Sequence, residues 1–244
     1  VGESIYDKII TLKDSYKVRD DLLVSGEINN EIKALPIMLG GYTIISNKDK
    51  ISDDKIESLL NSNMVYSNNE FNLPLMSLFV KNLKLTKVGE FNLDSFSAYE
   101  KFINNQFDTL LGTQRDYYRC KNRENNGKMS CNYKMLSGYT DLIQYCSIFE
   151  YDDKTNQVCM NFLEHLVSEA SQEKLTSIGM FPVMDKNIYS DENYIEYNQN
   201  LLTPLKTINV FLTNNNLKQL QLLLQDYFKG NLENKTEILK YLNG

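Results

Sequence analysis

The chain has 244 residues, of which 42% are hydrophobic and 24% are charged, as in ordinary globular proteins. That length is sufficient for one large domain or for two small lobes with a buried core. The net charge of -6 argues against nucleic acid or an anionic membrane surface as the main partner.

The first elements are predicted from a helix-like pattern and a turn. Apolar and charged residues alternate in helix-like clusters over residues 5–23. Asn29 and Asn30 are typical of a turn, and the apolar run that follows is typical of a buried strand. Gly40-Gly41 interrupts this run before β-branched residues resume. We expect the two glycines to let the backbone bend or another group approach closely.

The middle of the chain is predicted to form helices that lead to a strand and a glycine turn. The elements are, in order, a helix capped by Ser52 or Asp53, a helix over 75–83, a helix opened by Asp94 or Ser95, and a strand over 107–111. Gly112 ends that strand. Further on, LSGYTDLIQYCSIF predicts a bend at Ser137-Gly138 and then a buried strand or a strand–helix junction.

Three of the four arginines follow the glycine turn at intervals of four residues, at Arg115, Arg119 and Arg123. In a helix this spacing places them on one face. A solvated face, or ion pairs with Asp116 and Glu124, accounts for them without a ligand. Alternatively, Arg115 lies nearest the turn and meets a polar ligand group through its planar guanidinium. Both interpretations stay open at this point.

The segment from Asn161 to Val183 has the most specific succession of helix, cap and helix-end signals in the chain. Its sequence is NFLEHLVSEASQEKLTSIGMFPV. Apolar residues over 158–167 recur at the spacing of an amphipathic helix. Ser168 is suited to cap a second short helix, and Gly179 is suited to end it in a left-handed conformation. Phe181-Pro182 then favours an extended chain.

The chain is predicted to end in two helices that contribute to the core. A leucine stripe runs over 217–228, and Gly230-Asn231 ends it. A last short helix follows over 236–242. Stripes of this kind are typical of packing rather than of a binding function.

The four cysteines include no Cys-x-x-Cys pair, which argues against a metal site. Cys120 and Cys131 flank the polar loop KNRENNGKMS, and a disulfide between them would stabilise the fold by ~2–3 kcal/mol. Such a disulfide would fit an extracellular protein. Cys146 and Cys159 lie among apolar neighbours, as buried thiols do.

The sequence contains few of the residues and motifs on which catalytic sites depend. His165 is the only histidine, and its place at the edge of an apolar stripe favours a boundary or surface position. Serine or cysteine triads would therefore lack a base, and no phosphate-binding or dinucleotide glycine loop occurs. The carboxylates are scattered, so no glycosidase pair is singled out. We predict a chain that is not an enzyme and has no cofactor.

Segments spread over most of the chain resemble the family 1 extracellular solute-binding proteins, which are receptors of ABC importers. These segments include ALPIMLGGYTIISNKD, the Phe-Leu-Glu to Phe-Pro-Val run within 162–183, and the tail LKQLQLLLQDYFKGNLENKTEILKYLNG. The resemblance implies a helix-rich α/β fold of the type II periplasmic-binding-protein kind, with two lobes joined by crossing hinge strands. It also implies that the first lobe is incomplete, because the chain starts shortly before the crossing at Ala34-Leu35-Pro36.

The same resemblance implies a division of the chain into lobes. Residues 1–33 and 139–195 would form part of the first lobe, residues 34–138 the second lobe, and residues 196–244 the C-terminal closing helices. An incomplete first lobe would expose an apolar face. Three explanations stay open: an N-terminal part is absent from this chain, another chain covers the face, or the protein is a reduced relative that has lost transport.

The function implied by the resemblance is that of the solute-binding receptor of an ABC importer. The ligand would be a small polar solute, a sugar or oligosaccharide, held in an inter-lobe cleft by hinge closure, and the partner would be an ABC permease in the membrane. The location would be extracellular, as a membrane-anchored lipoprotein, or periplasmic, with a signal segment that is not present in this chain. The alternative is a non-transporting interaction or sensor module on a reduced solute-binding scaffold.

The resemblance also implies a ligand site whose members come from the crossing strands and the glycine turn. The candidate contacts are Tyr42, Gln114, Arg115, Asp116, Tyr139 and Asp141. Tyrosine faces would form apolar walls, and the polar groups would meet hydroxyl or charged groups. We expect Tyr42, Arg115 and Tyr139 to converge. The family often has a tryptophan after the glycine, whereas this chain contains none, which favours the alternative function.

Overall fold

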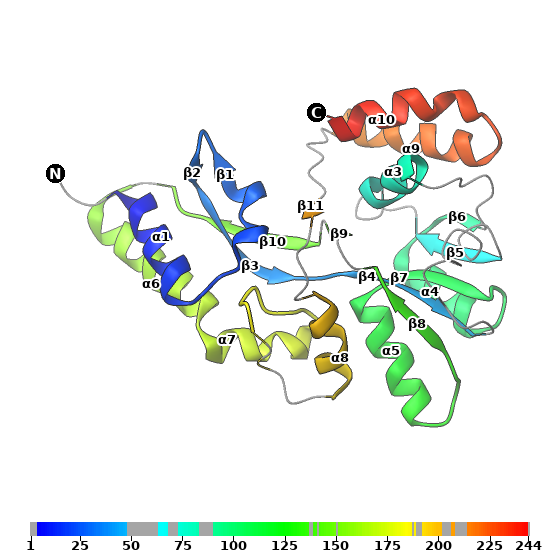
Figure 1. Ribbon diagram of the computed structural model, residues 1–244, viewed down its shortest axis with the longest axis horizontal. Coiled ribbons are helices and arrows are strands. Elements are labelled where there is room, and N and C mark those ends of the chain that lie inside the picture. Colours follow the sequence, from blue (N-terminus) through cyan, green and yellow to red (C-terminus); the bar gives the residue numbers. More distant parts are fainter. Residues whose placement is uncertain are drawn as a thin grey trace. The chain divides into compact units, whose positions relative to one another are not determined.

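The computed structural model describes residues 4–47, 63–67, 73–82, 90–136, 139–140, 142–149, 151–186, 188, 192–201, 206–207 and 214–243. Figure 1 shows the helices and strands. The helix predicted after Ser52 or Asp53 and the bend predicted at Ser137-Gly138 lie outside these residues.

The chain divides into two compact units. Unit 1 comprises residues 1–40 and 142–207, and unit 2 comprises residues 41–141 and 208–244. The three boundaries expected from the sequence, after residues 33, 138 and 195, lie after residues 40, 141 and 207 instead. The strand that starts at Ala34 stays in unit 1 because it pairs with a later strand of that unit. The C-terminal helices belong to unit 2, where the last of them packs against the helix Leu73–Asn82.

Unit 1 contains four α-helices, a hairpin and a strand pair among its described residues. The helices are α1 (Ile5–Ser15), α6 (Asp153–Val167), α7 (Glu169–Glu173) and α8 (Glu192–Leu201), with short 3-10 helices at Asp20–Leu22, Val24–Gly26 and Lys174–Ile178. The strands are β1 (Glu27–Ile28), β2 (Glu31–Ile32), β3 (Ala34–Leu39), β10 (Ile143–Ser147) and β11 (Lys206–Thr207).

The strands of unit 1 form where the asparagine turn and the apolar run predicted them. Asn29 and Asn30 have φ angles of 54° and 62°, the left-handed pair that joins β1 to β2 in a tight hairpin. β3 pairs with β10 in antiparallel register, from Ala34 opposite Ser147 to Leu39 opposite Ile143.

The helices predicted over 158–178 are confirmed, and so are the predicted cap at Ser168 and the left-handed end at Gly179. The Asp152 carboxylate accepts the Thr155 N–H at 3.0 Å and starts α6. Ser168 caps α7 by accepting the Ser171 N–H. Gly179 has a φ of 69° and ends the following 3-10 helix in the left-handed conformation. The chain direction out of this segment is therefore determined by local chemistry.

Gln172 joins this segment to its surroundings, although the sequence pattern does not single it out. Its side-chain amide is buried and donates to the carbonyl oxygens of Ile37 and Leu166, both at 2.8 Å. Its side-chain oxygen accepts the Val183 N–H at 3.0 Å. One side chain thus satisfies backbone groups of β3, α6 and the segment after Gly179.

An exposed apolar surface lies on unit 1. Phe149, Tyr151, Val158 and Phe162 are between 59% and 89% exposed. Val158 and Phe162 lie one helical turn apart on α6, away from the buried Met160 and Leu163. An exposed apolar face on this part of the chain is what the sequence led us to expect.

The described residues of unit 2 form a five-stranded mixed sheet with the order β6-β5-β7-β4-β8. The strands are β4 (Tyr42–Ser46), β5 (Met64–Ser67), β6 (Glu90–Leu93), β7 (Thr109–Thr113) and β8 (Asn132–Met135), and β9 (Tyr139–Thr140) follows them in the chain. The helices are α3 (Leu73–Asn82), α4 (Ser95–Ile103), α5 (Gln114–Asn125), α9 (Asn214–Phe228) and α10 (Lys235–Asn243), with a 3-10 helix at Leu232–Asn234.

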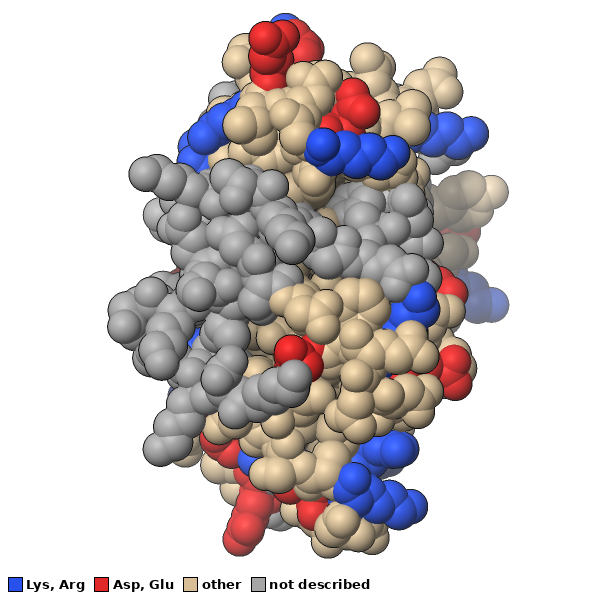
Figure 2. All heavy atoms as spheres, turned by 90° about the vertical axis from the view of Figure 1, so that its right-hand side faces the viewer, with Lys and Arg blue, Asp and Glu red and all other residues tan. Residues whose placement is uncertain are grey.

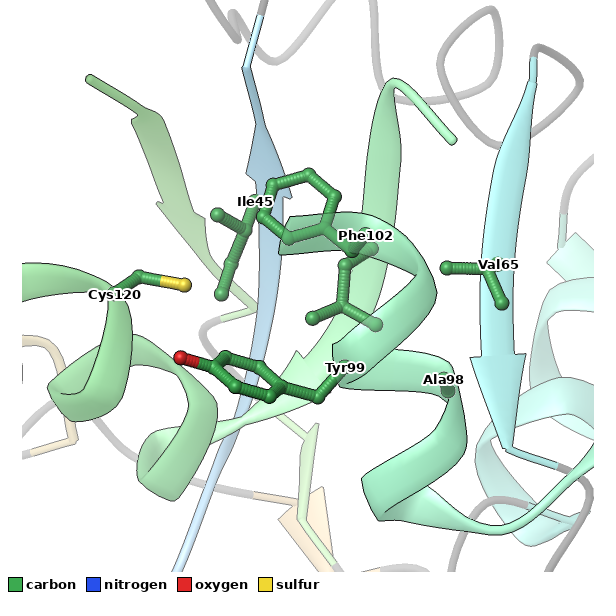
Figure 3. Packing of buried hydrophobic residues seen from close by; sticks show 7 residues of the cluster. Ile45, Val65, Ala98, Tyr99, Phe102 and Cys120 are labelled. Carbon is green, nitrogen blue, oxygen red and sulfur yellow. The ribbon is translucent and has the colours of Figure 1, made fainter. Parts of the chain in front are cut away.

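One core cluster of unit 2 lies between the sheet and helices α4 and α5. Ile45 and Val65 extend from the sheet toward Phe102 of α4 and Cys120 of α5, and all four side chains are fully buried (Figure 3). Asp94 caps α4 through the N–H groups of Phe96 and Ser97, as the sequence predicted. This packing holds the first turn of α5 at the end of β7.

Candidate functional site

The candidate site lies in unit 2, where β7 ends and α5 begins. The antiparallel pairing of β4 with β7 places Tyr42 opposite Thr113 and Thr43 opposite Gly112. Because α5 begins at the next residue, Gln114, the first turn of the helix lies beside the start of β4. This pairing brings together four of the six predicted contacts, Tyr42, Gln114, Arg115 and Asp116, from two distant parts of the sequence.

Gln114 joins the start of α5 to Gly41, the first residue of unit 2. Its N–H donates to the Gly41 carbonyl oxygen at 2.9 Å, and its side-chain oxygen accepts the Gly41 N–H at 3.1 Å. The carbonyl oxygen of the next residue, Tyr42, accepts the Leu136 N–H at 2.9 Å. The Tyr42 and Gln114 side chains are each less than 5% exposed. Gln114 therefore positions the backbone around Gly41.

Asp116 caps the helix on which Arg115 lies. Its carboxylate accepts the Thr113 N–H at 2.9 Å and forms an ion pair with Arg119 at 3.4 Å. Gly112 makes room for it, because a Cβ at that position would lie 2.8 Å from the carboxylate oxygen. The Thr-x-x-Asp spacing is the sequence signal of a capping box, and it accounts for Asp116 without a ligand contact.

Burial raises the pKa of Asp116 above its ordinary value of 3.8, and the Thr113 hydrogen bond and the Arg119 charge only partly oppose this. The folded protein then holds the proton more tightly than the unfolded chain, so this group should contribute less stability as pH rises from 3.8 through the raised pKa. The Asp116→Asn variant lacks this titration. We expect the Tm of the wild type relative to the variant to fall across that interval and to stay constant above it. A Tm difference that is constant from acid to neutral pH would contradict this result.

The Arg115 side chain is exposed, and among the described residues no hydrogen bond or ion pair joins it. Arg119 instead pairs with Asp116 and lies 5.4 Å from the centre of the Tyr99 ring. Arg119 is therefore explained by an ion pair within the protein, whereas Arg115 is available to an external group. The helix N-terminus beside it favours negative or partly negative ligand atoms.

The other two predicted contacts are less fully described. Tyr139 belongs to the short strand β9, and Asp141 lies outside the described residues. The predicted convergence of Tyr42, Arg115 and Tyr139 stays a prediction. The buried position of Tyr42 indicates that its ring contributes to packing.

The cysteines and acidic residues of the described part of the chain form no metal site. All four cysteines are unbonded thiols, so the predicted disulfide between Cys120 and Cys131 stays a prediction. Cys146 and Cys159 are partly exposed rather than buried. The described part of the chain contains no group of three or more His, Cys, Asp or Glu side chains that could hold a metal ion.

Two further observations concern the surface of the molecule. No helix within the described ranges is long and apolar enough to cross a membrane. On the face seen in Figure 2, acidic and basic side chains are interspersed. The described residues of that face therefore form no patch of a single charge.

No family model and no curated protein sequence matches the chain. Solved structures do resemble it. The GacH receptor of Streptomyces glaucescens, solved unliganded and with acarbose, is 9% identical with a TM-score of 0.64, over 94% of this chain and 76% of that chain. Maltose-bound MalE3 of T. maritima is 11% identical with a TM-score of 0.63, over 95% and 77%. A eukaryotic thiaminase-I bound to 3-deazathiamin is 12% identical with a TM-score of 0.60, over 89% and 76%.

At these identities the likeness establishes the fold alone. It confirms the α/β fold of two-lobed periplasmic solute-binding proteins that the sequence predicted. The thiaminase shares that fold, so the fold by itself does not separate binding from catalysis.

Proposed function

We propose that the chain is a solute-binding protein that holds a small polar solute at the N-terminal end of α5. The observation that carries this proposal is Arg115, an exposed guanidinium at a capped helix N-terminus whose surrounding backbone is held by Gln114 and Asp116. A preorganised donor of this kind binds hydroxyl or anionic oxygen atoms without having to reorganise. Closure of the two lobes around the solute, as the sequence resemblance implies, belongs to this proposal.

The finer assignment is a carbohydrate receptor of an ABC importer, located outside the cell or in the periplasm and acting with a membrane permease. Two structural neighbours support the carbohydrate, because one was solved with acarbose and the other with maltose. Binding rather than catalysis is favoured because the site offers a guanidinium, with neither a histidine nor a thiol among Tyr42, Gln114, Arg115 and Asp116.

Replacing Arg115 with alanine is expected to weaken solute binding by roughly 10-fold or more, because a charge-assisted hydrogen bond contributes about 1.5–3 kcal/mol. Arg115→Lys should retain part of the affinity, because lysine keeps the charge but loses the planar fork. Isothermal titration measures both. The solute is first selected by thermal shift against maltose, acarbose, other oligosaccharides and peptides.

Arg123→Ala is the matched control. It removes the same charge from the same helix about 12 Å farther along its axis. Equal effects of the two substitutions would mean that only net charge matters and would contradict a contact at Arg115. Failure of every solute to raise the Tm would contradict the proposal itself.

The alternative function is a non-transporting interaction or sensor module, and one observation favours it. Phe149, Tyr151, Val158 and Phe162 present exposed apolar surface on unit 1, which is typical of contact with another protein. A stable dimer in light scattering, together with no thermal shift by any solute, would support this alternative over the receptor.

A further inference from the structure

Cys120 and Cys131 lie together in unit 2, although eleven positions separate them in the chain. Cys120 extends from α5 into the buried core beside Ile45 (Figure 3). Cys131, just before β8, packs against the same core. Each thiol is the largest influence on the pKa of the other. The Cys131 N–H also donates to Glu124 of α5, one helical turn after Cys120, so the residue before β8 is held against the helix that carries Cys120.

The two thiols have different surroundings. Cys120 is fully buried, whereas Cys131 is partly exposed. The Cys131 backbone is held in place because its N–H donates to Glu124 Oε1 at 3.0 Å. Lys121 lies beside it, with its Nζ 3.6 Å from Glu124 and 4.6 Å from the centre of the Tyr133 ring. A small reagent in solution therefore meets Cys131 first.

The electrostatics agree with this order. Hydrogen bonding with the Cys120 thiol is the largest effect on the pKa of Cys131, and it lowers this pKa. The Lys121 charge also lowers it, whereas burial and Glu124 raise it. The same hydrogen bond, followed by burial, raises the pKa of Cys120. Because the thiolate is the nucleophile in disulfide exchange, Cys131 is the more reactive of the two.

We propose that Cys120 and Cys131 are a redox-active pair, which a small-molecule disulfide oxidises to an intramolecular disulfide through a first attack by Cys131. The Cys131 thiolate attacks one sulfur of the oxidant, such as glutathione disulfide, and releases one glutathione thiolate. The Cys120 sulfur then gives up its proton, attacks the Cys131 sulfur and releases the second glutathione. The two protein thiols lose two electrons and two protons in total, and the oxidant becomes two thiols.

The product would tie α5, the helix that carries Arg115, to the start of β8. It closes a short loop, so the main expected consequence is higher stability of unit 2 in an oxidising compartment. The pair Cys146 and Cys159 serves as an internal comparison. These two thiols also interact, but burial raises the pKa of Cys146 and no hydrogen bond between them contributes to that shift.

The test uses the full chain carrying Cys146→Ser and Cys159→Ser, treated with glutathione disulfide. We expect intact mass to fall by two hydrogen atoms with no glutathione retained, both remaining thiols to resist iodoacetamide, and the Tm to rise by about 5 °C or more. Dithiothreitol should reverse all three changes.

Two further variants determine the order of attack. In the same background, Cys120→Ala should retain one glutathione on Cys131, because the resolving thiol is absent, and Cys131→Ala should react far more slowly. Circular dichroism before treatment verifies that both variants fold. Glutathione retained on the unsubstituted pair, equal reactivity of the two variants, or no reaction at all would each overturn the proposal.

Discussion

Replacing Gly26 with alanine is expected to reduce the free energy of unfolding by about 3–5 kcal/mol, at the upper end of overpacking effects. A Cβ at this position would lie 2.2 Å from the Ala34 carbonyl oxygen, which is a backbone atom and cannot rotate away. The same glycine donates its N–H to the Leu23 carbonyl oxygen and accepts the Lys33 N–H, both at 2.8 Å. Relieving the clash would therefore also break hydrogen bonds that hold the hairpin beside β3.

Urea denaturation followed by circular dichroism measures this effect, and Gly127→Ala is the matched control. Gly127 has a φ of 66°, and a Cβ added there would have no other atom within 4 Å, so alanine meets backbone strain but no clash. We expect the control to cost about 1 kcal/mol. Equal losses in the two variants would show that the close approach at Gly26 is not the cause.

Replacing Gly112 with alanine is expected to cost about 2–4 kcal/mol and to disturb the candidate site directly. The new Cβ would lie 2.8 Å from the Asp116 carboxylate oxygen and 2.9 Å from its Cβ. The carboxylate would have to leave the Thr113 N–H, which removes the cap of α5 and leaves buried polar groups without their partner.

A double-mutant cycle tests this mechanism. In an Asp116→Gly background both the carboxylate and the Cβ that the new side chain would meet are absent, so Gly112→Ala should cost at least about 1 kcal/mol less than it does in the wild type. Additive losses in urea denaturation would place the cost elsewhere in β7 and would contradict the coupling between Gly112 and Asp116.

Much of the fold could be predicted where local chemistry decides the structure. The caps at Asp94 and Ser168, the left-handed Gly179 and the Asn29-Asn30 turn each depend on residues within a few positions of one another. Such signals survive in a single sequence because no distant partner is needed.

Features that depend on distant partners were not predicted. The three hydrogen bonds of Gln172, the contact of Gly26 with the Ala34 carbonyl oxygen, and the closure of Gln114 on Gly41 each join segments that only the folded chain brings together. The boundary between the units shifted for the same reason, because β3 pairs with β10 more than a hundred residues away.

The candidate site was predicted only in part. The sequence pointed to the turn after Gly112, and the structure places Gln114 and Asp116 there as buried positioning residues beside the exposed Arg115. The spacing of polar residues does not reveal which of them point outward. That depends on the register of β4 with β7, which brings Tyr42 opposite Thr113.

The central claim is that a solute binds at the start of α5, and hydrogen–deuterium exchange with and without maltose, or acarbose in a parallel experiment, tests it most directly. We expect bound sugar to slow exchange in peptides that cover residues 40–42 and 113–116, because the Gly41 and Gln114 N–H groups belong to the hydrogen-bonded pair beside Arg115. Slower exchange confined to unit 1, or unchanged exchange throughout the chain with both sugars, would contradict the account.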